Sequence, residues 1–217
     1  MPSGTSSQQP LLSQLSLAAF ADSLAARTAT PGGGSLAAFM VACGAGTVSM
    51  AFRFTSGDKY AAVESAMAQR AADLDRLRAR AATLVDADSA SYDRVTASFA
   101  LPKSTDAEKA ARTAAIQAAL KGALEVPFET MQLAVAGLKL AAEGVAAINP
   151  NLASDCATGA LALGAGLEGA WLNVRINAAS IKDAGYVREK VDAGEALRRS
   201  ASELGVLVRD GAAKHLG

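Results

Sequence analysis

Two aspartates in the segment LVDADSASYDRV are the side chains best placed to do chemistry. Asp86 and Asp88 are two residues apart, so on a helix they point about 200° apart and only one can face the core. Asp88 shares one side of such a helix with four apolar or aromatic residues, Leu84, Tyr92, Val95 and Phe99. A carboxylate in apolar surroundings loses hydration and its pKa tends to rise, which suits a general acid or base. On pattern alone, a buried structural aspartate paired with an arginine or a helix end is the better interpretation.

The single histidine, His215, restricts how protons could be moved. It is the third residue from the end of the 217-residue chain. Acid–base chemistry must therefore use carboxylates, lysine or tyrosine. A zinc or iron site built on imidazoles is nearly excluded, and we expect neither a metal nor a cofactor.

The segment TPGGGS opens a long uncharged stretch and is a candidate binding loop. Gly32, Gly33 and Gly34 can bring backbone N–H groups close to a ligand, and Ser35 can cap the helix that follows. The spacing matches neither a dinucleotide fingerprint nor a P-loop. A tight loop before a buried helix explains it equally well.

The segment NPNLASDCATGALALGAGLEGAWLNVRIN carries three more polar candidates. Asn173 and Asn177 are one helical turn apart and can present their amides together, whereas Asp155 lies five turns away, ~27 Å along the axis. One small ligand cannot touch both ends within one subunit. Polar residues that tie a bundle together are an equally good explanation. Lys59, in TSGDKY, could bind a carboxylate, although a solvated loop lysine is the commoner case.

Small residues in the same segment recur at a three- and four-residue spacing. These residues, which we call the seam, are Gly159, Ala162, Gly166, Gly169 and Asn173. Another helix can pack closely against such a face, either from the same chain or from a second copy. We expect a homodimer that uses this seam as its interface.

The composition excludes several classes of protein. The 21 basic and 21 acidic residues cancel, which gives no general attraction to nucleic acid. The first ten residues have no basic run typical of a signal peptide, and we expect them to be a disordered tail. Cys43 and Cys156 lie among small residues and favour buried free thiols in a cytoplasmic protein.

The hydrophobic periodicity predicts a single all-α domain over residues 11–217, a bundle of six or seven helices. Helices are expected over 11–27, over 35–55 and over 61–99, the last as one long helix or two with a break. Further helices are expected from Thr105 to about 147 with a kink or restart at Pro127, from a cap at Ser154 or Asp155 to 177, and over 186–214. Thr105 and Glu108 have the spacing of a capping box. Residues 28–52 carry no charge and are long enough to span a bilayer, but their small side chains and unmarked flanks favour a buried central helix.

Together these motifs resemble the cyclodeaminase/cyclohydrolase family, which includes bacterial methenyltetrahydrofolate cyclohydrolases and the C-terminal domain of formimidoyltransferase-cyclodeaminase. The matching segments are TPGGGS, the G..KY loop, LVDADSASYDRV, LPK followed by EKAAR, NPNLASD and LNVRIN, in family order over about residues 12 to 183.

The resemblance implies a helical bundle, a homodimer and a tetrahydrofolate substrate. It matches the family's catalytic aspartate to Asp88, and it makes the glycine-rich loop, Lys59 and the amides of NVRIN folate contacts. Methenyltetrahydrofolate cyclohydrolase is the activity we expect, because the chain lacks a transferase domain. Formimidoyltetrahydrofolate cyclodeaminase and a non-catalytic folate-binding or assembly bundle remain as alternatives.

Overall fold

The protein is described by a computed structural model over residues 11–216, and this part of the chain is helical without a strand. The helices are α1 (Leu17–Ala25), α2 (Gly33–Arg53), α3 (Glu64–Phe99), α4 (Asp106–Gly144), α5 (Ala153–Ala178) and α6 (Ala184–Ala213). Four short 3₁₀ turns join them: η1 (Leu12–Gln14), η2 (Asp58–Tyr60), η3 (Val145–Ala147) and η4 (Pro150–Leu152). The expected all-α bundle is confirmed. The expected tail, residues 1–10, lies outside the described residues.

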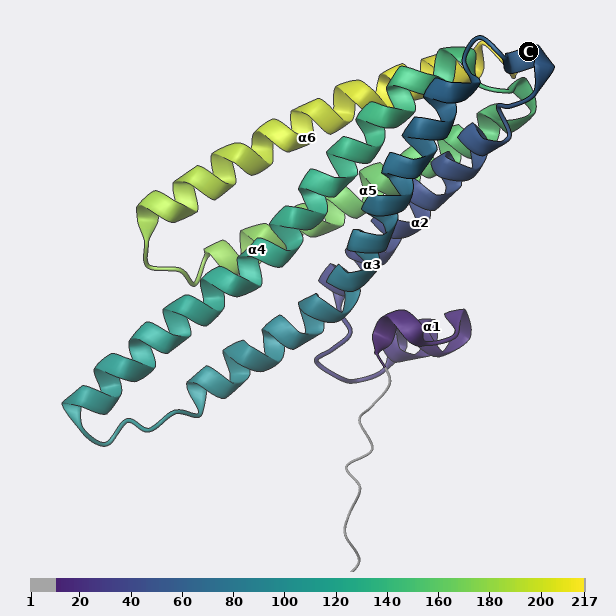
Figure 1. Ribbon diagram of the computed structural model, residues 1–217. Coiled ribbons are helices and arrows are strands. Elements are labelled where there is room, and N and C mark those ends of the chain that lie inside the picture. The colour runs from purple at the N-terminus through teal and green to yellow at the C-terminus, as the bar shows by residue number, and fades with distance from the viewer. Residues whose placement is uncertain (1–10, 217) are drawn as a thin grey trace, which may run out of the picture.

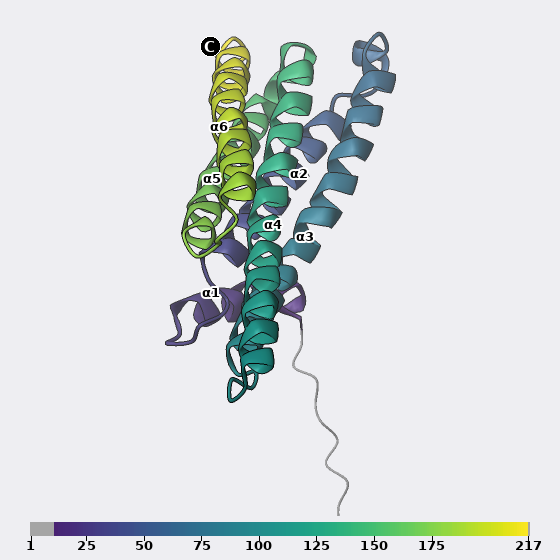
Figure 2. The same cartoon turned by 90° about the vertical axis from the view of Figure 1, so that its left-hand side faces the viewer.

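Helices α2 to α6 lie side by side along one long axis (Figure 1). Seen from the side, α3, α4 and α6 form one layer, with α2 and α5 behind them (Figure 2). The contacts agree with two layers, because α2 packs mainly on α5 and α3, and α4 packs on α3, α5 and α6. The turn between α3 and α4 projects beyond the α5–α6 end of the bundle (Figure 1).

Glycines allow α2 and α5 to approach almost to backbone contact. A Cβ on Gly44 would lie 2.6 Å from the carbonyl oxygen of Gly159, and one on Gly166 would lie 2.7 Å from Cγ2 of Val41. The seam of α5 therefore packs against α2 of the same chain. The expectation that the seam is a homodimer interface is wrong, because its glycines are already covered within one subunit.

Helix α2 packs between α3 and α5. Among the described residues it is the single helix long and apolar enough to cross a bilayer, and 61% of its most apolar window is buried by the rest of the protein. It is apolar on most sides because α5 covers one side and α3 another. Neighbouring helices bury most of α2, as expected, but one side that includes Leu36 and Cys43 is exposed.

Several expected boundaries hold and others move. Helix α3 is one continuous helix, and α4 begins with a complete capping box between Thr105 and Glu108. The first predicted helix is shorter than residues 11–27, because Ser16 caps a new helix by accepting a hydrogen bond from the N–H of Ala19. Helix α4 runs through Pro127 without restarting there.

The start of α5 and the cysteines also correct the sequence-based expectations. Neither Ser154 nor Asp155 caps α5: the helix begins at Ala153, and Asp155 lies in its first turn, where a negative charge is favourable. Cys156 is a buried free thiol as expected, but Cys43 is exposed. Burial raises the pKa of the Cys156 thiol to about 12, which makes it a poor nucleophile.

Candidate functional site

A pocket of about 260 Å³ opens where the start of α2, the last third of α3, the middle of α4 and the end of α5 converge. The α1–α2 connection closes one side of it. The lining residues are Ala29, Thr30, Gly32, Gly33, Gly34, Asp88, Ser91, Tyr92, Val95, Leu120, Ala123, Asn173 and Asn177. Predicted site residues from three separate sequence segments are thus brought together in one cavity.

Asp88 is the acidic group of this pocket. Its side chain is half-buried, and one carboxylate oxygen, Oδ2, accepts a hydrogen bond of 2.9 Å from the hydroxyl of Ser35. Loss of hydration raises the pKa of Asp88, and the hydroxyl and backbone N–H of Ser35 partly offset that rise. Asp88 is therefore a carboxylate whose pKa is shifted towards the range useful for both accepting and returning a proton.

Asp86 lies on the other side of α3, as the spacing predicts. Its Oδ1 accepts a hydrogen bond of 3.3 Å from the backbone N–H of Ser13, and it does not line the pocket. The apolar side that Asp88 shares is not buried along its length, since Tyr92 is 48% exposed and Phe99 is 52% exposed. Beyond Leu84 this side of α3 faces the pocket and then solvent rather than the core.

The glycine-rich loop both lines the pocket and begins helix α2. Gly32, Gly33 and Gly34 all line the pocket, but the N-cap of α2 is Gly32, and no side chain caps this helix from within. Ser35 is fully buried and does not line the pocket. The expectation that Ser35 caps α2 is therefore wrong, because its hydroxyl is bound to Asp88, and its predicted contact with substrate stays a prediction.

Asn173 and Asn177 present their amides on the α5 side of the pocket. The Nδ2 group of Asn173 donates to the carbonyl of Gly169 at 2.9 Å, and that of Asn177 donates to the carbonyl of Ala123 at 3.0 Å. Each amide retains its side-chain oxygen and one N–H for a ligand. The pair can therefore recognise a planar group that carries both donors and acceptors.

Pro127 explains why Asn177 can bind across to α4. Proline has no N–H, so the carbonyl four residues earlier in a helix, that of Ala123, loses its usual donor. Asn177 supplies the missing hydrogen bond from α5. A residue outside the pocket thus fixes the rotamer of one that lines it.

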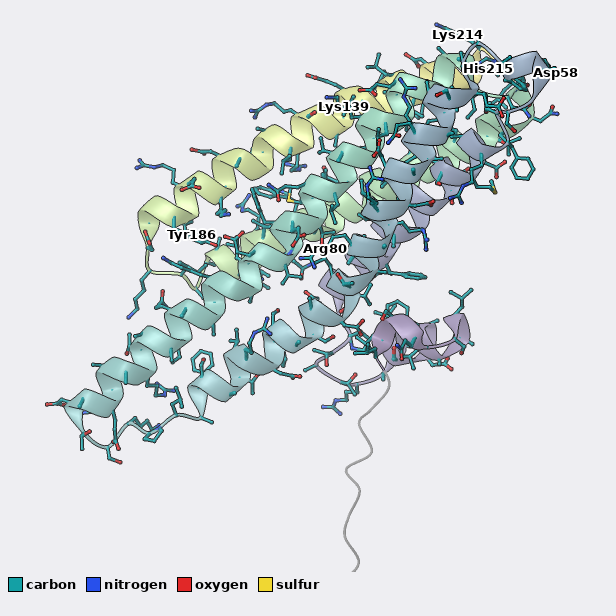
Figure 3. All side chains as sticks on the ribbon, in the orientation of Figure 1. Asp58, Arg80, Lys139, Tyr186, Lys214 and His215 are labelled. Atoms are coloured by element: carbon teal, nitrogen blue, oxygen red, sulfur yellow. The ribbon has the colours of Figure 1, made fainter. Side chains whose placement is uncertain are left out.

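Lys59 and Asp155 do not line the pocket. Lys59 is an exposed residue of η2, and its Nζ lies 5.3 Å from the centroid of the Tyr60 ring. Figure 3 places the neighbouring Asp58 towards the same end of the bundle as Lys214 and His215, opposite the end that carries Tyr186. Asp155 lies in the first turn of α5, and the pocket lies at its last turns. Neither residue therefore belongs to this pocket within one subunit, and their predicted contacts with folate stay predictions.

Seven lining residues escaped the sequence analysis as site residues: Ala29, Thr30, Ser91, Tyr92, Val95, Leu120 and Ala123. Tyr92 could have been found, because it lies one helical turn after Asp88. Leu120 and Ala123 belong to a helix without a distinctive motif, so only the fold reveals them. Within the described residues, no group of three or more His, Cys, Asp or Glu side chains is placed to hold a metal ion.

Comparison with known proteins identifies relatives over most of the chain. A family profile described as formiminotransferase-cyclodeaminase matches residues 16–195. A methenyltetrahydrofolate cyclohydrolase from Methylorubrum extorquens is 38% identical over 186 residues, which cover 85% of this chain and 89% of that protein. A formimidoyltransferase-cyclodeaminase from Rattus norvegicus is 37% identical over 181 residues, and this chain spans about a third (32%) of its length.

The fold has a solved counterpart. The crystal structure of a formiminotetrahydrofolate cyclodeaminase from Thermotoga maritima superposes with a TM-score of 0.83 at 25% identity. The match covers 93% of this chain and 97% of the other. The bundle, including all four helices that form the pocket, is therefore shared with a known structure.

Proposed function

Because the chain belongs to the formiminotransferase-cyclodeaminase family, we propose that it is a methenyltetrahydrofolate cyclohydrolase, which hydrolyses 5,10-methenyltetrahydrofolate to 10-formyltetrahydrofolate. The observation that carries this proposal is Asp88, a half-buried carboxylate with a raised pKa in a pocket between helices. The similarity to the Methylorubrum extorquens cyclohydrolase over nearly its whole length supports the same activity.

The reaction needs two proton transfers that one carboxylate can perform. The substrate carries an electrophilic carbon between two nitrogens and a delocalised positive charge. A water oxygen bonds to that carbon while Asp88 accepts one of the water's protons. The bond from carbon to N5 then breaks, and its electron pair takes the proton back from Asp88, while the hydroxyl proton of the intermediate leaves to solvent. Ionised Asp88 also stabilises the bound cation, so the scheme uses no cofactor.

The rest of the pocket can hold the substrate in position. The amides of Asn173 and Asn177 offer hydrogen bonds to a planar heterocycle, and Tyr92 supplies an aromatic face against which a cation can lie. Ligand pockets usually measure roughly 300–1,000 Å³. This cavity, at about 260 Å³, is slightly smaller than that range. It can hold the reacting ring system of the substrate, and the glutamate end would extend outside it.

Formimidoyltetrahydrofolate cyclodeaminase is the second candidate. The solved structure that matches this fold is a cyclodeaminase by title, and the rat relative carries the same activity in its name. In that reaction a second nitrogen of the same substrate molecule attacks the formimino carbon and ammonia leaves, so the same carboxylate could move the proton.

One paired assay tests both candidates. Loss of methenyltetrahydrofolate absorbance, corrected for the uncatalysed rate, should be accelerated by the purified chain, whereas formimidoyltetrahydrofolate incubated in parallel should release ammonia slowly or not at all. Faster turnover of the formimino substrate would reverse the assignment. If neither substrate reacts, the non-catalytic alternative becomes the better one.

The variant Asp88→Asn tests whether the activity depends on the carboxylate. The substitution keeps the size of the side chain but removes the proton acceptor, so kcat should fall by roughly 10²-fold or more with an unchanged circular dichroism spectrum. Asp86→Asn is the matched control, two residues away and outside the pocket, and should retain most of the activity. Near wild-type turnover by Asp88→Asn would remove Asp88 from the mechanism.

We further propose that the protein is a homodimer that pairs through the outer face of α2 and α5. Along α2 this face runs through Leu36, Met40, Cys43, Met50 and Phe54 at three- to seven-residue steps, and Leu36 and Phe54 are 37% and 62% exposed. No charged residue interrupts α2 between Gly33 and Phe52.

The neighbouring helix extends the same apolar face. Leu161, Leu172 and Ile176 of α5 are 56%, 68% and 71% exposed. Leu172 directly precedes the pocket residue Asn173, and Ile176 directly precedes the pocket residue Asn177. This apolar face therefore borders the site. Large exposed apolar patches are typical of protein–protein interfaces, and self-association of two copies would cover this one.

Two leucines of nearly equal exposure allow a matched test of this interface. Leu161 lies on the proposed face, and Leu207, which is 57% exposed, lies on α6 in the other layer. Light scattering should show a dimer for the wild type and for Leu207→Glu, but a monomer for Leu161→Glu. A monomeric wild type at micromolar concentration would remove the dimer, and dissociation by Leu207→Glu alone would move the interface to α6.

We also propose that the protein acts in the cytoplasm. Cys43 and Cys156 are both free thiols, and the cytoplasm keeps thiols reduced. Fractionation of cells that express the tagged protein, with a cytoplasmic and an exported marker alongside, tests this location.

A further inference from the structure

The carboxylate of Asp88 rests on the first turn of α2, which is otherwise uncapped. The N-cap residue of α2 is Gly32, and no side chain of its own segment binds the first N–H groups. Asp88 reaches this turn from α3, 53 residues further along the chain, and accepts the hydroxyl hydrogen of Ser35 on Oδ2 at 2.9 Å. A negative charge is favourable at this end of a helix.

Ser35 is sealed between Asp88 and a second hydroxyl. It is 0% exposed, and its Oγ lies 3.3 Å from the Oγ of Ser89, with either atom able to donate. Ser89 follows Asp88 directly on α3. The three side chains form a short chain of polar groups, Ser89–Ser35–Asp88, whose middle member has no access to solvent.

We propose that Ser35 is a positioning residue whose hydroxyl, together with that of Ser89, forms a reversible hydrogen-bond relay that serves both protonation states of Asp88. When Asp88 is ionised, Ser35 donates to Oδ2 and accepts from Ser89. When Oδ2 carries the proton, Asp88 donates to Ser35, and Ser35 donates to Ser89. A hydroxyl can act in both directions because it has one donor hydrogen and two acceptor lone pairs.

A backbone N–H could not replace this relay. It only donates, so it stabilises the carboxylate and opposes the protonated form. A carboxyl group that takes up a proton in one step and returns it in the next needs a partner that satisfies both forms. Rotation of two hydroxyl groups provides this without movement of a heavy atom.

Few other groups can compete with the relay for control of Asp88. Among the residues that line the pocket, Tyr92, one turn further along α3, has the only other ionisable side chain. The first turns of α2 carry no charge, α4 contributes Leu120 and Ala123, and α5 contributes the two asparagine amides. The raised pKa of Asp88 results from burial, opposed by the hydrogen bonds of Ser35.

The first test measures the pKa of Asp88 without using activity. Aspartate carboxyl carbons labelled with ¹³C are titrated by NMR, and the Asp88 signal is identified by its loss in Asp88→Asn. In Ser35→Ala the ionised form loses a charge-assisted hydrogen bond, so the pKa of Asp88 should rise by about one pH unit or more. Ser35→Cys, which fills the same space with a weaker donor, should raise it less. Unchanged titration of Asp88 in the folded Cys variant overturns the proposal.

The second test uses kinetics and rests on the proposed cyclohydrolase function. Because a base works only when ionised, the acid limb of the kcat–pH profile should move to higher pH in Ser35→Ala, with kcat lowered and KM nearly unchanged. Ser89→Ala should lower kcat less, since Ser35 still donates to the carboxylate. Wild-type kcat and acid limb in Ser35→Ala would overturn the relay.

Ser98→Ala is the control for loss of a buried hydroxyl from α3. Ser98 is 7% exposed and donates to the carbonyl of Val95 at 2.6 Å, away from Asp88. It should leave both the titration of Asp88 and the kinetic profile unchanged. If the chain has no cyclohydrolase activity but Ser35→Ala still raises the pKa of Asp88, the proposed function fails and the hydrogen-bond assignment stands.

Discussion

Gly34 lies so close to the side chain of Asp88 that a Cβ on this glycine would be 2.6 Å from Cγ of the carboxylate. The third glycine of TPGGGS therefore leaves room for the Asp88 side chain as well as lining the pocket. Real Cβ atoms do not approach so closely, so any side chain at position 34 must displace either Asp88 or the start of α2.

Gly34→Ala is expected to lower kcat by roughly 10²-fold, because a displacement of about 1 Å at a reacting group can cost that much. Gly33→Ala is the matched control, since a Cβ there would meet only Nδ2 of Asn173 at 3.5 Å, an ordinary contact. Steady-state kinetics and thermal melting of both variants check the prediction. It is wrong if Gly34→Ala melts like the wild type and turns over at the wild-type rate.

Tyr92 is expected to act through its ring rather than its hydroxyl. Its side chain lines the pocket one turn from Asp88 and is about half exposed, so an incoming cationic ring can lie against it. Tyr92→Leu should raise KM for the cationic substrate by roughly 3- to 30-fold, the range expected for loss of a cation–π contact. Tyr92→Phe keeps the ring and should retain most of the affinity. Equal losses in both variants would point to the hydroxyl instead.

Asp88 could be predicted from the sequence because its signal is local. Residues 84 to 99 fall on one α-helix, and the periodicity of that helix alone separates Asp88 from Asp86. The same holds for Thr105 and Glu108, whose capping box depends only on a separation of three residues. Local spacing also predicted that Asn173 and Asn177 would act together.

Contacts between distant segments could not be predicted in this way. Ser35 has the spacing of a helix cap, but its hydroxyl binds a carboxylate 53 residues away, so its burial depends on how α2 meets α3. Asn177 is oriented by a carbonyl that Pro127 leaves free on α4. The seam shows that α5 has a close helical partner without showing which one, because a glycine face fits α2 or a second copy equally well.

Gly166→Ala and Gly164→Ala separate the packed face of α5 from its open side. A Cβ on Gly166 would lie 2.7 Å from Cγ2 of Val41 and 2.8 Å from the carbonyl oxygen of Ala37, and nothing lies within 4 Å of one on Gly164. Gly166→Ala should lower the free energy of unfolding by ~1–3 kcal/mol through overpacking. Gly164→Ala should raise it by up to about 1 kcal/mol, because alanine is the better helix former.

Urea unfolding followed by circular dichroism checks both values. Because the seam packs within the subunit, Gly166→Ala should unfold more easily without first dissociating into a folded monomer. Equal stability of the two variants would show that α5 relaxes away from α2 without cost.

Asp88→Asn is expected to stabilise the fold in a pH-dependent manner. The folded protein raises the pKa of Asp88 above its usual value, so it favours the protonated over the ionised form. Asp88 therefore contributes most to stability below its unfolded-state pKa, and that contribution is lost as pH rises towards the folded-state pKa. Asparagine does not ionise, so the variant does not lose this contribution to stability as the pH rises.

The free energy of unfolding of Asp88→Asn minus that of the wild type should increase with pH across this window and then level off. Urea titrations between pH 4 and pH 8 measure this difference, and Asp86→Asn corrects for removal of one negative charge from α3. A difference that stays flat or falls with rising pH would show that the fold does not penalise the ionised carboxylate, and the reason for assigning Asp88 as a tuned base would be lost.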